Sequence, residues 1–521
     1  MMNLAWTLLF VNWLLEWDMK RKFALFGYKG LLHYALVLFL VTAVWLIWSD
    51  DTYRGLDCLR QTLPLLAIPL VVLTSRPLNR RQWYIVAIGY IGTLFVVTVV
   101  GLVRWLTIPD LPYRQTVPYI SHIRFSLNIC LAICIMMTYI LSTFNLSGNK
   151  KIQKLQYPLS RHILTVLSIV CVLWFLSFLF LLQSYTGLIV LVVTAFVSLA
   201  FGYRKIVLRR IRLTLLLVTV LTMGGLVGVC AYYVGEYYTP RLAHVDKSRY
   251  TLNGNPYSFA HDGLVECGRC VNDFVCESEL REQWLSVSNY PIDSLTSVGY
   301  PVYPALVRYL NAMGVSKDSV GVACLTSSDV AAIEQGIANP IYTQESSLRR
   351  MIYVMLYEYE NYRCFHTVKG FTMLQRIELW QAACTEVCKN WLHGVGTGDV
   401  EPVIEHRLQL SGSPLVGSHM YPHNQYLSHA MSFGVIAFAL LCAVAVWAFV
   451  RQRLWRNTLW VAAVTIFLLS CLTEDTLFTS AGAVFSALWL SLLSKVRHLW
   501  EPQSTVYNSP VISEISLPDR K

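Results

Sequence analysis

Residues 84–106 read YIVAIGYIGTLFVVTVVGLVRWL, a continuous apolar run whose one charge, Arg104, stands near its end. The hydrocarbon core of a bilayer demands about 20 apolar residues from each spanning helix. Every backbone polar group must also be satisfied there, which leaves helices and closed barrels as the only spanning structures. Because the run is long and does not alternate between polar and apolar residues, it predicts a transmembrane helix rather than a barrel strand.

Similar apolar runs recur along most of the chain, and the composition agrees with them. Hydrophobic residues make up 55% of the 521 residues and charged residues 14%, whereas soluble proteins carry roughly 25% charge. We therefore expect an all-α polytopic membrane protein with about 11, or else 12, transmembrane helices. The expected spans are 4–17 (short for a span), 31–49, 58–75, 84–106, 123–144, 163–182, 187–202, 213–236, 425–450, 457–473 and 478–495.

The charges of the connecting loops predict the topology. Basic residues such as Arg209 follow alternate runs, and acidic residues such as Asp50 and Asp475 occupy the loops between them. Basic loops face the cytoplasm, so the long segment 237–424 is expected on the other side, in the periplasm of a bacterial inner membrane. The same loops account for the formal net charge of +11, and a nucleic-acid partner is not expected.

These patterns divide the chain into four parts. Residues 1–236 are predicted to form transmembrane helices 1–8, and residues 425–497 to form helices 9–11. Residues 498–521 lack periodicity and are predicted to be a disordered cytoplasmic tail. The polar segment 237–424 is predicted to be a large, mainly helical periplasmic loop domain. Its helix-like stretches lie near 278–287, 302–313, 328–336, 346–363 and 372–391.

Cysteines are concentrated in the loop domain. An exported domain lies in an oxidising compartment, so we expect some of them to form disulfides. The alternative is zinc, for which Cys267-x-x-Cys270 would supply half a site, but no second CxxC stands at finger-like spacing, and no metal is assigned. The seven cysteines are Cys267, Cys270, Cys276, Cys324, Cys364, Cys384 and Cys388.

Chemistry-bearing residues gather between Gln375 and Gly434, whereas P-loop, GxSxG and HExxH motifs are absent from the sequence. An amphipathic helix is expected to begin at Gln375-Arg376-Ile377-Glu378-Leu379-Trp380. A turn follows at His393-Gly394-Val395-Gly396-Thr397-Gly398-Asp399, where glycine permits backbone geometries closed to other residues. The segment Pro422-His423-Asn424-Gln425-Tyr426-Leu427 then stands immediately before an expected span.

This arrangement resembles the O-antigen ligase and polymerase superfamily. Members of that family carry an Arg-x-x-x-Trp helix, a GxGxG turn and an HNxYL segment before a transmembrane helix. The resemblance covers the topology of most of the chain and is specific over about 375–434. Further segments resemble a subgroup with a long periplasmic loop, namely Arg308-Tyr309-Leu310, Lys317-Asp318 and Ile333-Glu334-Gln335-Gly336-Ile337.

The resemblance implies transfer of a glycan from polyprenyl (undecaprenyl) diphosphate to an acceptor hydroxyl, without metal, nucleotide or other cofactor. His423 matches the family histidine, which takes the acceptor's proton; an imidazole with a reference pKa of about 6.5 is largely neutral at working pH. Arg376 matches the family's loop arginine, which stabilises the diphosphate as negative charge develops on it. The same matching assigns substrate binding to Gly396, Gly398, Asp399, Asn424 and Tyr426.

One departure from the family pattern concerns its second phosphate-binding arginine, in a Ser-Arg pair at the outer end of a middle helix. The corresponding segment here is Gln183-Ser184-Tyr185-Thr186-Gly187, so Tyr185 stands in place of the arginine. A tyrosine donates one hydrogen bond but carries no charge. Arg124, at the outer start of the fifth expected span, is the candidate substitute, and Arg54 and Arg114 are alternatives.

The expected partners are a polyprenyl-diphosphate-linked glycan donor, a lipid A-core or other glycan acceptor, and membrane lipid. Ligation of O-antigen onto lipid A-core is the first hypothesis. The alternatives are an O-antigen polymerase of the same superfamily and protein O-glycosylation. Readings from other classes are a membrane transporter or flippase, and an inactive scaffold for glycan assembly, which the Tyr185 departure keeps open.

Overall fold

The structure is a computed structural model, and the chain divides into two compact units. One comprises Met1–Leu221 and Leu379–Lys521, and the other comprises Thr222–Glu378. The predicted loop domain 237–424 is divided differently, because residues 379–424 belong with the helices of the first unit. The residues described are 2–26, 29–108, 111, 115–118, 120–147, 158–202, 209–240, 249–296, 298–343, 348–368 and 372–496. The predicted tail 498–521 and the alternative cation Arg114 lie outside them.

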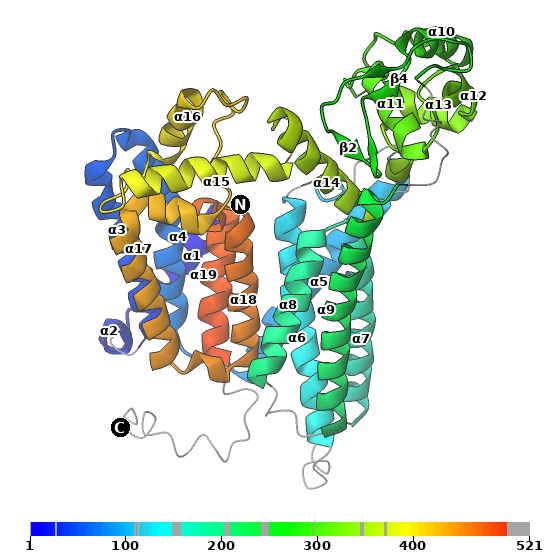
Figure 1. The fold of residues 1–521 in the computed structure, drawn as a ribbon. Helices are drawn as coiled ribbons and strands as arrows, with labels where there is room; N and C mark the ends of the chain where they lie inside the picture. Colours follow the sequence, from blue (N-terminus) through cyan, green and yellow to red (C-terminus); the bar gives the residue numbers. More distant parts are fainter. Residues whose placement is uncertain are drawn as a thin grey trace, which may run out of the picture. The chain divides into compact units, whose positions relative to one another are not determined.

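The first unit is helical throughout its described parts (Figure 1). Two long helices, α9 (Arg209–Tyr238) and α15 (Thr372–Lys389), cross the boundary between the units. The remaining elements of this unit are α1 (Met2–Leu15), α2 (Met19–Phe26), α3 (Gly30–Val44), the 3₁₀ helix η1 (Trp45–Trp48), α4 (Thr52–Thr74), α5 (Arg80–Thr107), α6 (His122–Ser147), α7 (Pro158–Leu181), α8 (Tyr185–Gly202), α16 (Val400–Leu410), α17 (Gln425–Arg451), η5 (Leu454–Arg456), α18 (Thr458–Thr473), η6 (Thr476–Phe478) and α19 (Ser480–Lys495).

The apolar runs form the helices that the sequence predicts. Among the described residues, eight helices are long and apolar enough to cross a membrane, and three further apolar helices, in α1, α18 and α19, are shorter. The opening run 84–106 lies inside α5, which begins with a capping box. Asn79 accepts from the backbone N–H of Gln82, and the Gln82 side chain accepts from that of Asn79. The fold is thus all-α and polytopic in character, whereas the count of 11 spans stays a prediction.

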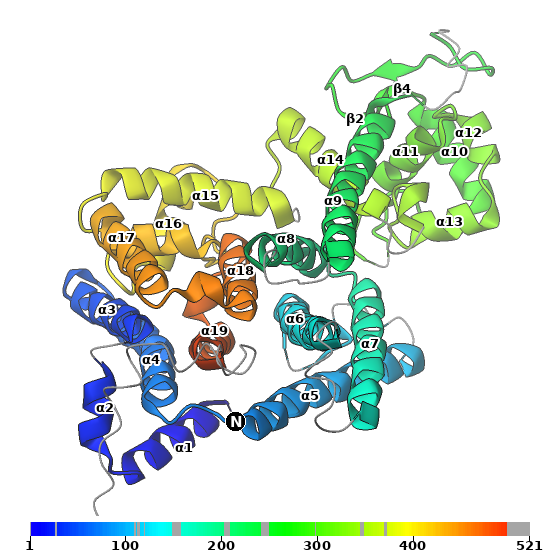
Figure 2. The same cartoon turned by 90° about the horizontal axis from the view of Figure 1, so that it is seen from below.

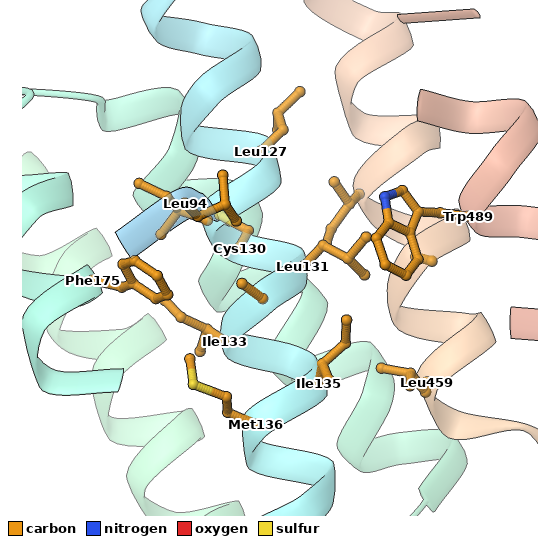
Figure 3. Packing of buried hydrophobic residues seen from close by; sticks show 14 of the residues in the cluster. Leu94, Leu127, Cys130, Leu131, Ile133, Ile135, Met136, Phe175, Leu459 and Trp489 are labelled. Carbon is orange, nitrogen blue, oxygen red and sulfur yellow. The ribbon is translucent and has the colours of Figure 1, made fainter. Parts of the chain in front are cut away.

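Within the first unit, the other helices pack mainly around α4 and α6. Helix α4 contacts α3 and α19, and α17 contacts α3, so these four helices lie together (Figure 2). Helix α6 contacts α5, α7, α8 and α18, and its side chains form the centre of the largest apolar cluster. In Figure 3, Leu131 faces Trp489 on one side of α6, and Ile133 lies towards Phe175 on the other.

The second unit combines helices with two small two-stranded sheets, of which one is a hairpin, and the sequence did not predict these strands. The hairpin β2–β3 turns through Cys267 and Gly268, both with positive φ, 55° and 72°. Two such residues are typical of the type I′ turn that matches the twist of paired strands. The elements are β1 (Ser258–Phe259), β2 (Val265–Glu266), β3 (Arg269–Cys270), β4 (Asp273–Val275), α10 (Glu277–Val287), α11 (Val302–Met313), α12 (Ser319–Ala323), α13 (Ser327–Glu334), η4 (Pro340–Thr343) and α14 (Leu348–Phe365).

A buried ion pair holds the core of the second unit. Arg308 on α11 donates to both carboxylate oxygens of Glu266 at 2.9 and 3.1 Å, and Asn339 donates to the same carboxylate at 2.8 Å. The guanidinium also lies 3.4 Å from the ring centroid of Tyr357. Burial of an unpaired charge is costly, so these contacts are what allow Arg308 to be buried. They explain this residue by its role in the fold, without a role in substrate binding.

The other motif residues of this unit also support its fold. The Lys317 ammonium is buried and donates to the carbonyls of Cys270, Val271 and Asp273 at 2.7, 2.7 and 2.8 Å. Burial lowers the pKa of Lys317 to about 7. The neighbouring Asp318 caps α12, where its carboxylate accepts from a backbone N–H. The segments that resemble the long-loop subgroup therefore carry structural contacts.

The expected disulfides are not present. All fourteen cysteines lie in the described part of the chain, and every one is a free thiol. In the β2–β3 hairpin, Cys270 pairs across the strands with Val265, while Cys267 occupies the turn. The local strand register thus separates the two thiols of the CxxC sequence. Groups of three or more residues able to bind a metal are absent from the described residues.

Candidate functional site

The site begins with a contact between two segments of the 375–434 stretch. Trp380 on α15 donates its indole N–H to the carbonyl of Pro422 at 2.8 Å. Residues four apart on a helix share a face, so Arg376 stands one turn before Trp380 on the same side of α15. The tryptophan of the Arg-x-x-x-Trp pattern therefore anchors the chain immediately before His423.

His423 occupies an unusual backbone conformation at the start of α17. Its φ is 51°, in the left-handed region that non-glycine residues seldom adopt. The next residue, Asn424, is buried and caps α17 by accepting from the backbone N–H groups of Tyr426 and Leu427 at 3.1 and 3.3 Å. The backbone of His423 is thus held between a tryptophan-bound carbonyl and a helix cap, and its side chain is half-buried.

A buried carboxylate, Asp475, lies beside His423. It is 7% exposed, and one of its oxygens accepts a hydrogen bond from the Ser428 hydroxyl on the first turn of α17. Burial raises the pKa of Asp475, while the Ser428 hydrogen bond and the nearby His423 act in the opposite direction. The other oxygen, Oδ2, is buried and accepts no hydrogen bond from the described residues. The sequence identified Asp475 only as a loop acid that marks topology.

Further hydrogen bonds join the start of α17 to the final helices. Gln425 accepts from the backbone N–H of Leu477 at 2.7 Å, which ties α17 to η6. The Tyr426 hydroxyl donates to the carbonyl of Leu468 on α18 at 2.9 Å. In this structure, Asn424 and Tyr426 therefore make contacts that position the helix. The sequence assigned both residues to substrate binding, and that assignment stays a prediction.

The glycine turn packs against a break in α17. Gly434 interrupts the helix with φ 74° and ψ 167°, and a Cβ built on it would lie 2.6 Å from the Leu392 carbonyl oxygen. The backbone N–H groups of Val395 and Gly396 donate to carbonyls of α17 at 2.9 and 3.0 Å. In return, Val435 donates to the carbonyl of Trp391 at 2.7 Å. Only residues without side chains permit this approach of two backbones.

The later part of the turn is bound to the segment between η1 and α4. A Cβ at Gly396 would lie 2.8 Å from the Ser49 Cα, and one at Gly398 would lie 2.5 Å from the Gly55 nitrogen. The Asp399 carboxylate accepts from the backbone N–H groups of Asp50 and Asp51 at 2.7 and 3.1 Å. The turn therefore joins α17 to the segment that leads into α4, and both oxygens of Asp399 already hold backbone donors.

Arg124 and Tyr185 lie on neighbouring helix ends. Tyr185 begins α8, and Arg124 lies in the first turn of α6. The two helices touch immediately below, where a Cβ at Gly187 would lie 2.7 Å from that of Ser126. Tyr185 stands two positions before Gly187 on α8, and Arg124 stands two positions before Ser126 on α6. The structure thus brings the tyrosine and its proposed substitute cation to the same place in the first unit.

An open cavity of about 730 Å³ lies between the start of α4 and α16. Of the predicted residues, Asp399 and the alternative cation Arg54 line it, whereas His423 does not. Arg54 contacts Glu401 at 3.3 Å, and the Nδ1 atom of His419 contacts the same Glu401 oxygen at 3.3 Å. The cavity was missed in the sequence because its walls come from segments almost 350 positions apart.

The structure therefore arranges the predicted residues of the first unit in three places, and the remaining predicted residue, Arg376, belongs to the second unit. His423, Asn424 and Tyr426 lie together at the start of α17, beside Trp380 and Asp475. The glycine turn joins α17 to the α4 segment, and Arg124 and Tyr185 lie at the ends of α6 and α8. Comparison of the chain with models of known protein families gives no match, and comparison with curated proteins also gives none.

Proposed function

We propose that the protein is a membrane glycosyltransferase that moves a glycan from a polyprenyl diphosphate to an acceptor hydroxyl. The observation that carries the proposal is the cluster around His423. Trp380 holds the preceding carbonyl, Asn424 caps the following helix, and the buried carboxylate of Asp475 lies close enough to His423 to feel its charge and to bond its backbone. A carboxylate near a histidine base favours proton abstraction, because its negative charge stabilises the protonated imidazole.

In the proposed reaction, His423 takes the proton from the acceptor hydroxyl as its oxygen attacks the anomeric carbon. The bond between that carbon and the diphosphate oxygen breaks, and the electron pair leaves on the polyprenyl diphosphate. Arg376 stabilises this charge, since a guanidinium binds phosphate oxygens in a planar, bidentate manner and stays charged throughout. Arg124 is the proposed second cation, in the place where Tyr185 departs from the family pattern.

The proposed setting is a bacterial inner membrane, with the outer loops in the periplasm. The free energy of the reaction comes from the sugar–diphosphate bond, so the proposal requires no metal and no nucleotide. Lipid A-core is the proposed acceptor. A second repeat unit on the same carrier is the alternative, and it would make the protein a polymerase.

The proposal is tested by purifying the chain and measuring transfer from an undecaprenyl-diphosphate-linked glycan to lipid A-core. We expect His423→Ala and Arg376→Ala each to abolish transfer while the protein remains in the membrane. His366→Ala is the matched control, because His366 is an exposed residue of the second unit. Transfer that persists in both site variants would refute the assigned mechanism.

A deletion strain separates the alternatives. Loss of glycan-capped core with retained polymer indicates a ligase, whereas core that carries a single repeat unit indicates a polymerase. An unchanged surface glycan together with a lost uptake phenotype indicates a transporter and contradicts the proposal.

A further inference from the structure

The cavity between α4 and α16 has the size and the lining of a small-ligand site. Its volume of about 730 Å³ falls within the range of roughly 300–1,000 Å³ that such sites occupy. The α4 side contributes the segment from Asp50 to Arg54, and the opposite side is helix α16. The floor includes Asp399, the last residue of the glycine turn.

Several wall residues are held in place by contacts with neighbouring residues. Arg54 contacts both Asp51 and Glu401, and His419 contacts Glu401. The Glu405 carboxylate accepts from the backbone N–H of Gly417 at 2.5 Å. These contacts fix the shape of the cavity before any ligand arrives, which reduces the entropic cost of binding.

Other lining groups face solvent and are available to a ligand. Tyr53 is 84% exposed and presents an aromatic face. The side chains of His406 and Gln409 are exposed on α16. The Asp50 carboxylate forms no ion pair with another described residue, although its backbone N–H donates to Asp399. An aromatic face combined with an amide, an imidazole and a carboxylate matches the apolar faces and many hydroxyls of a sugar ring.

The charges of the lining select among sugars. Four carboxylates line the cavity, from Asp50, Asp51, Asp399 and Glu405, against the single guanidinium of Arg54. Carboxylates accept hydrogen bonds from hydroxyl and amine groups, whereas an anionic ligand placed here faces like charges. The lining therefore favours uncharged sugars and disfavours phosphorylated or uronic sugars, and it is a poor place for the diphosphate of the donor.

A short stretch of chain joins the cavity to the His423 cluster. His419 lines the cavity, and His423 follows it four residues later. Between them, the Pro422 carbonyl accepts from the indole N–H of Trp380 at 2.8 Å. A chain bound in the cavity therefore lies near the segment that leads into His423.

We infer that this cavity is a subsite for the uncharged sugars of the acceptor glycan, and that it excludes anionic ones. The inference rests on the proposed function, because it takes His423 as the base that acts on the bound acceptor. Within it, the Gly396, Gly398 and Asp399 turn acts by building the floor of the subsite, and Tyr53 is the residue on which a sugar ring stacks.

Binding can be measured without transfer. The full chain in nanodiscs is titrated with three uncharged trisaccharides, maltotriose, chitotriose and mannotriose, and with anionic trigalacturonate, using saturation-transfer NMR. We expect at least one uncharged trisaccharide to bind and trigalacturonate not to bind. Tyr53→Ala should weaken binding roughly threefold to tenfold, the range for loss of an aromatic contact. Asp50→Lys should admit trigalacturonate. Asp57→Lys is the matched control, since Asp57 lies nearby on α4 outside the lining, and it should change neither affinity.

The inference is overturned if all three uncharged trisaccharides fail to bind, if trigalacturonate binds the unaltered chain equally well, or if Tyr53→Ala leaves binding unchanged. The His423→Ala variant tests the proposed function separately from the subsite. That variant should lose transfer yet bind the trisaccharide normally. If the unaltered chain binds trisaccharide but transfers no glycan, the proposed function fails and the cavity stands. If transfer occurs without binding in the cavity, the subsite fails alone.

Discussion

Gly434 offers a direct test of how the glycine turn is held. This residue breaks α17 with φ 74° and ψ 167°, a region occupied almost exclusively by glycine. A Cβ there would lie 2.6 Å from the carbonyl oxygen of Leu392 and 2.9 Å from the nitrogen of Gly394. Both obstacles are backbone atoms, which cannot rotate away as a flexible side chain can. Gly434→Ala must therefore shift either α17 or the turn.

The expected loss in the free energy of unfolding of Gly434→Ala has two parts. Holding alanine in this backbone region costs about 1–3 kcal/mol, and forcing an extra carbon into a closed contact costs about another 1–3 kcal/mol. The total of about 2–6 kcal/mol is a large fraction of a typical folding free energy of about 5–15 kcal/mol. The displaced turn also pulls on the segments that hold Asp399 and Trp391, so transfer should fall together with stability.

Thermal unfolding of the detergent-solubilised protein, followed by gel filtration of the fraction that remains monodisperse, measures the first effect. The matched control is Gly225→Ala in α9, where an added Cβ meets no atom within 4 Å. That substitution should leave stability unchanged or raise it by up to about 1 kcal/mol, because alanine favours a helix interior. A Gly434→Ala protein with the same unfolding temperature as the control would refute the close-contact account of the turn.

The remaining predictions concern three carboxylates. Glu266→Gln should destabilise the second unit by about 3–5 kcal/mol, because it leaves Arg308 charged and buried without its partner; limited proteolysis of that unit measures the loss, and unchanged protection would contradict it. Burial raises the pKa of Glu358 from 4.5 to about 7, so the native state holds this proton more tightly than the unfolded chain does. The stability that protonated Glu358 contributes to the folded state is complete below pH 4.5 and is lost as the pH rises through 7. Glu358→Gln should accordingly raise stability at pH 8 by about 2 kcal/mol once partial solvent access is allowed for, and an unaltered pH profile of unfolding would count against this. Asp475→Asn should lower kcat roughly tenfold or more with little change in KM, because it removes the negative charge that stabilises protonated His423; a comparable rise in KM with kcat unchanged would assign Asp475 to substrate binding instead.

Much of the helical structure could be predicted from the sequence. The expected stretch 302–313 coincides with α11, and the opening run 84–106 lies within α5. Apolar runs and helical periodicity are local properties, because each residue's preference depends mainly on neighbours within a few positions. The two small sheets of the second unit were not predicted, because strands of two or three residues leave too little pattern to detect.

The candidate site could be predicted only in part. The stretch 375–434 indicates where the chemistry-bearing residues lie, but not which of them touch. Asp475 became a candidate only because α17 and the loop before η6 meet in space, 47 positions apart at the Ser428 contact. The predicted disulfides are absent, and for Cys267 and Cys270 the reason is strand register, which sequence spacing does not reveal.

By itself, the sequence determined that this is an all-α protein of long apolar helices with a polar segment before α17, because hydrophobic content and chain length decide where backbone groups can be satisfied. The tertiary structure decided which residues share a site. It alone placed Asp475 beside His423, used the glycines for close backbone approach, and opened a cavity between α4 and α16. Such contacts depend on how segments that are distant in the chain pack against one another, and local sequence patterns do not specify that packing.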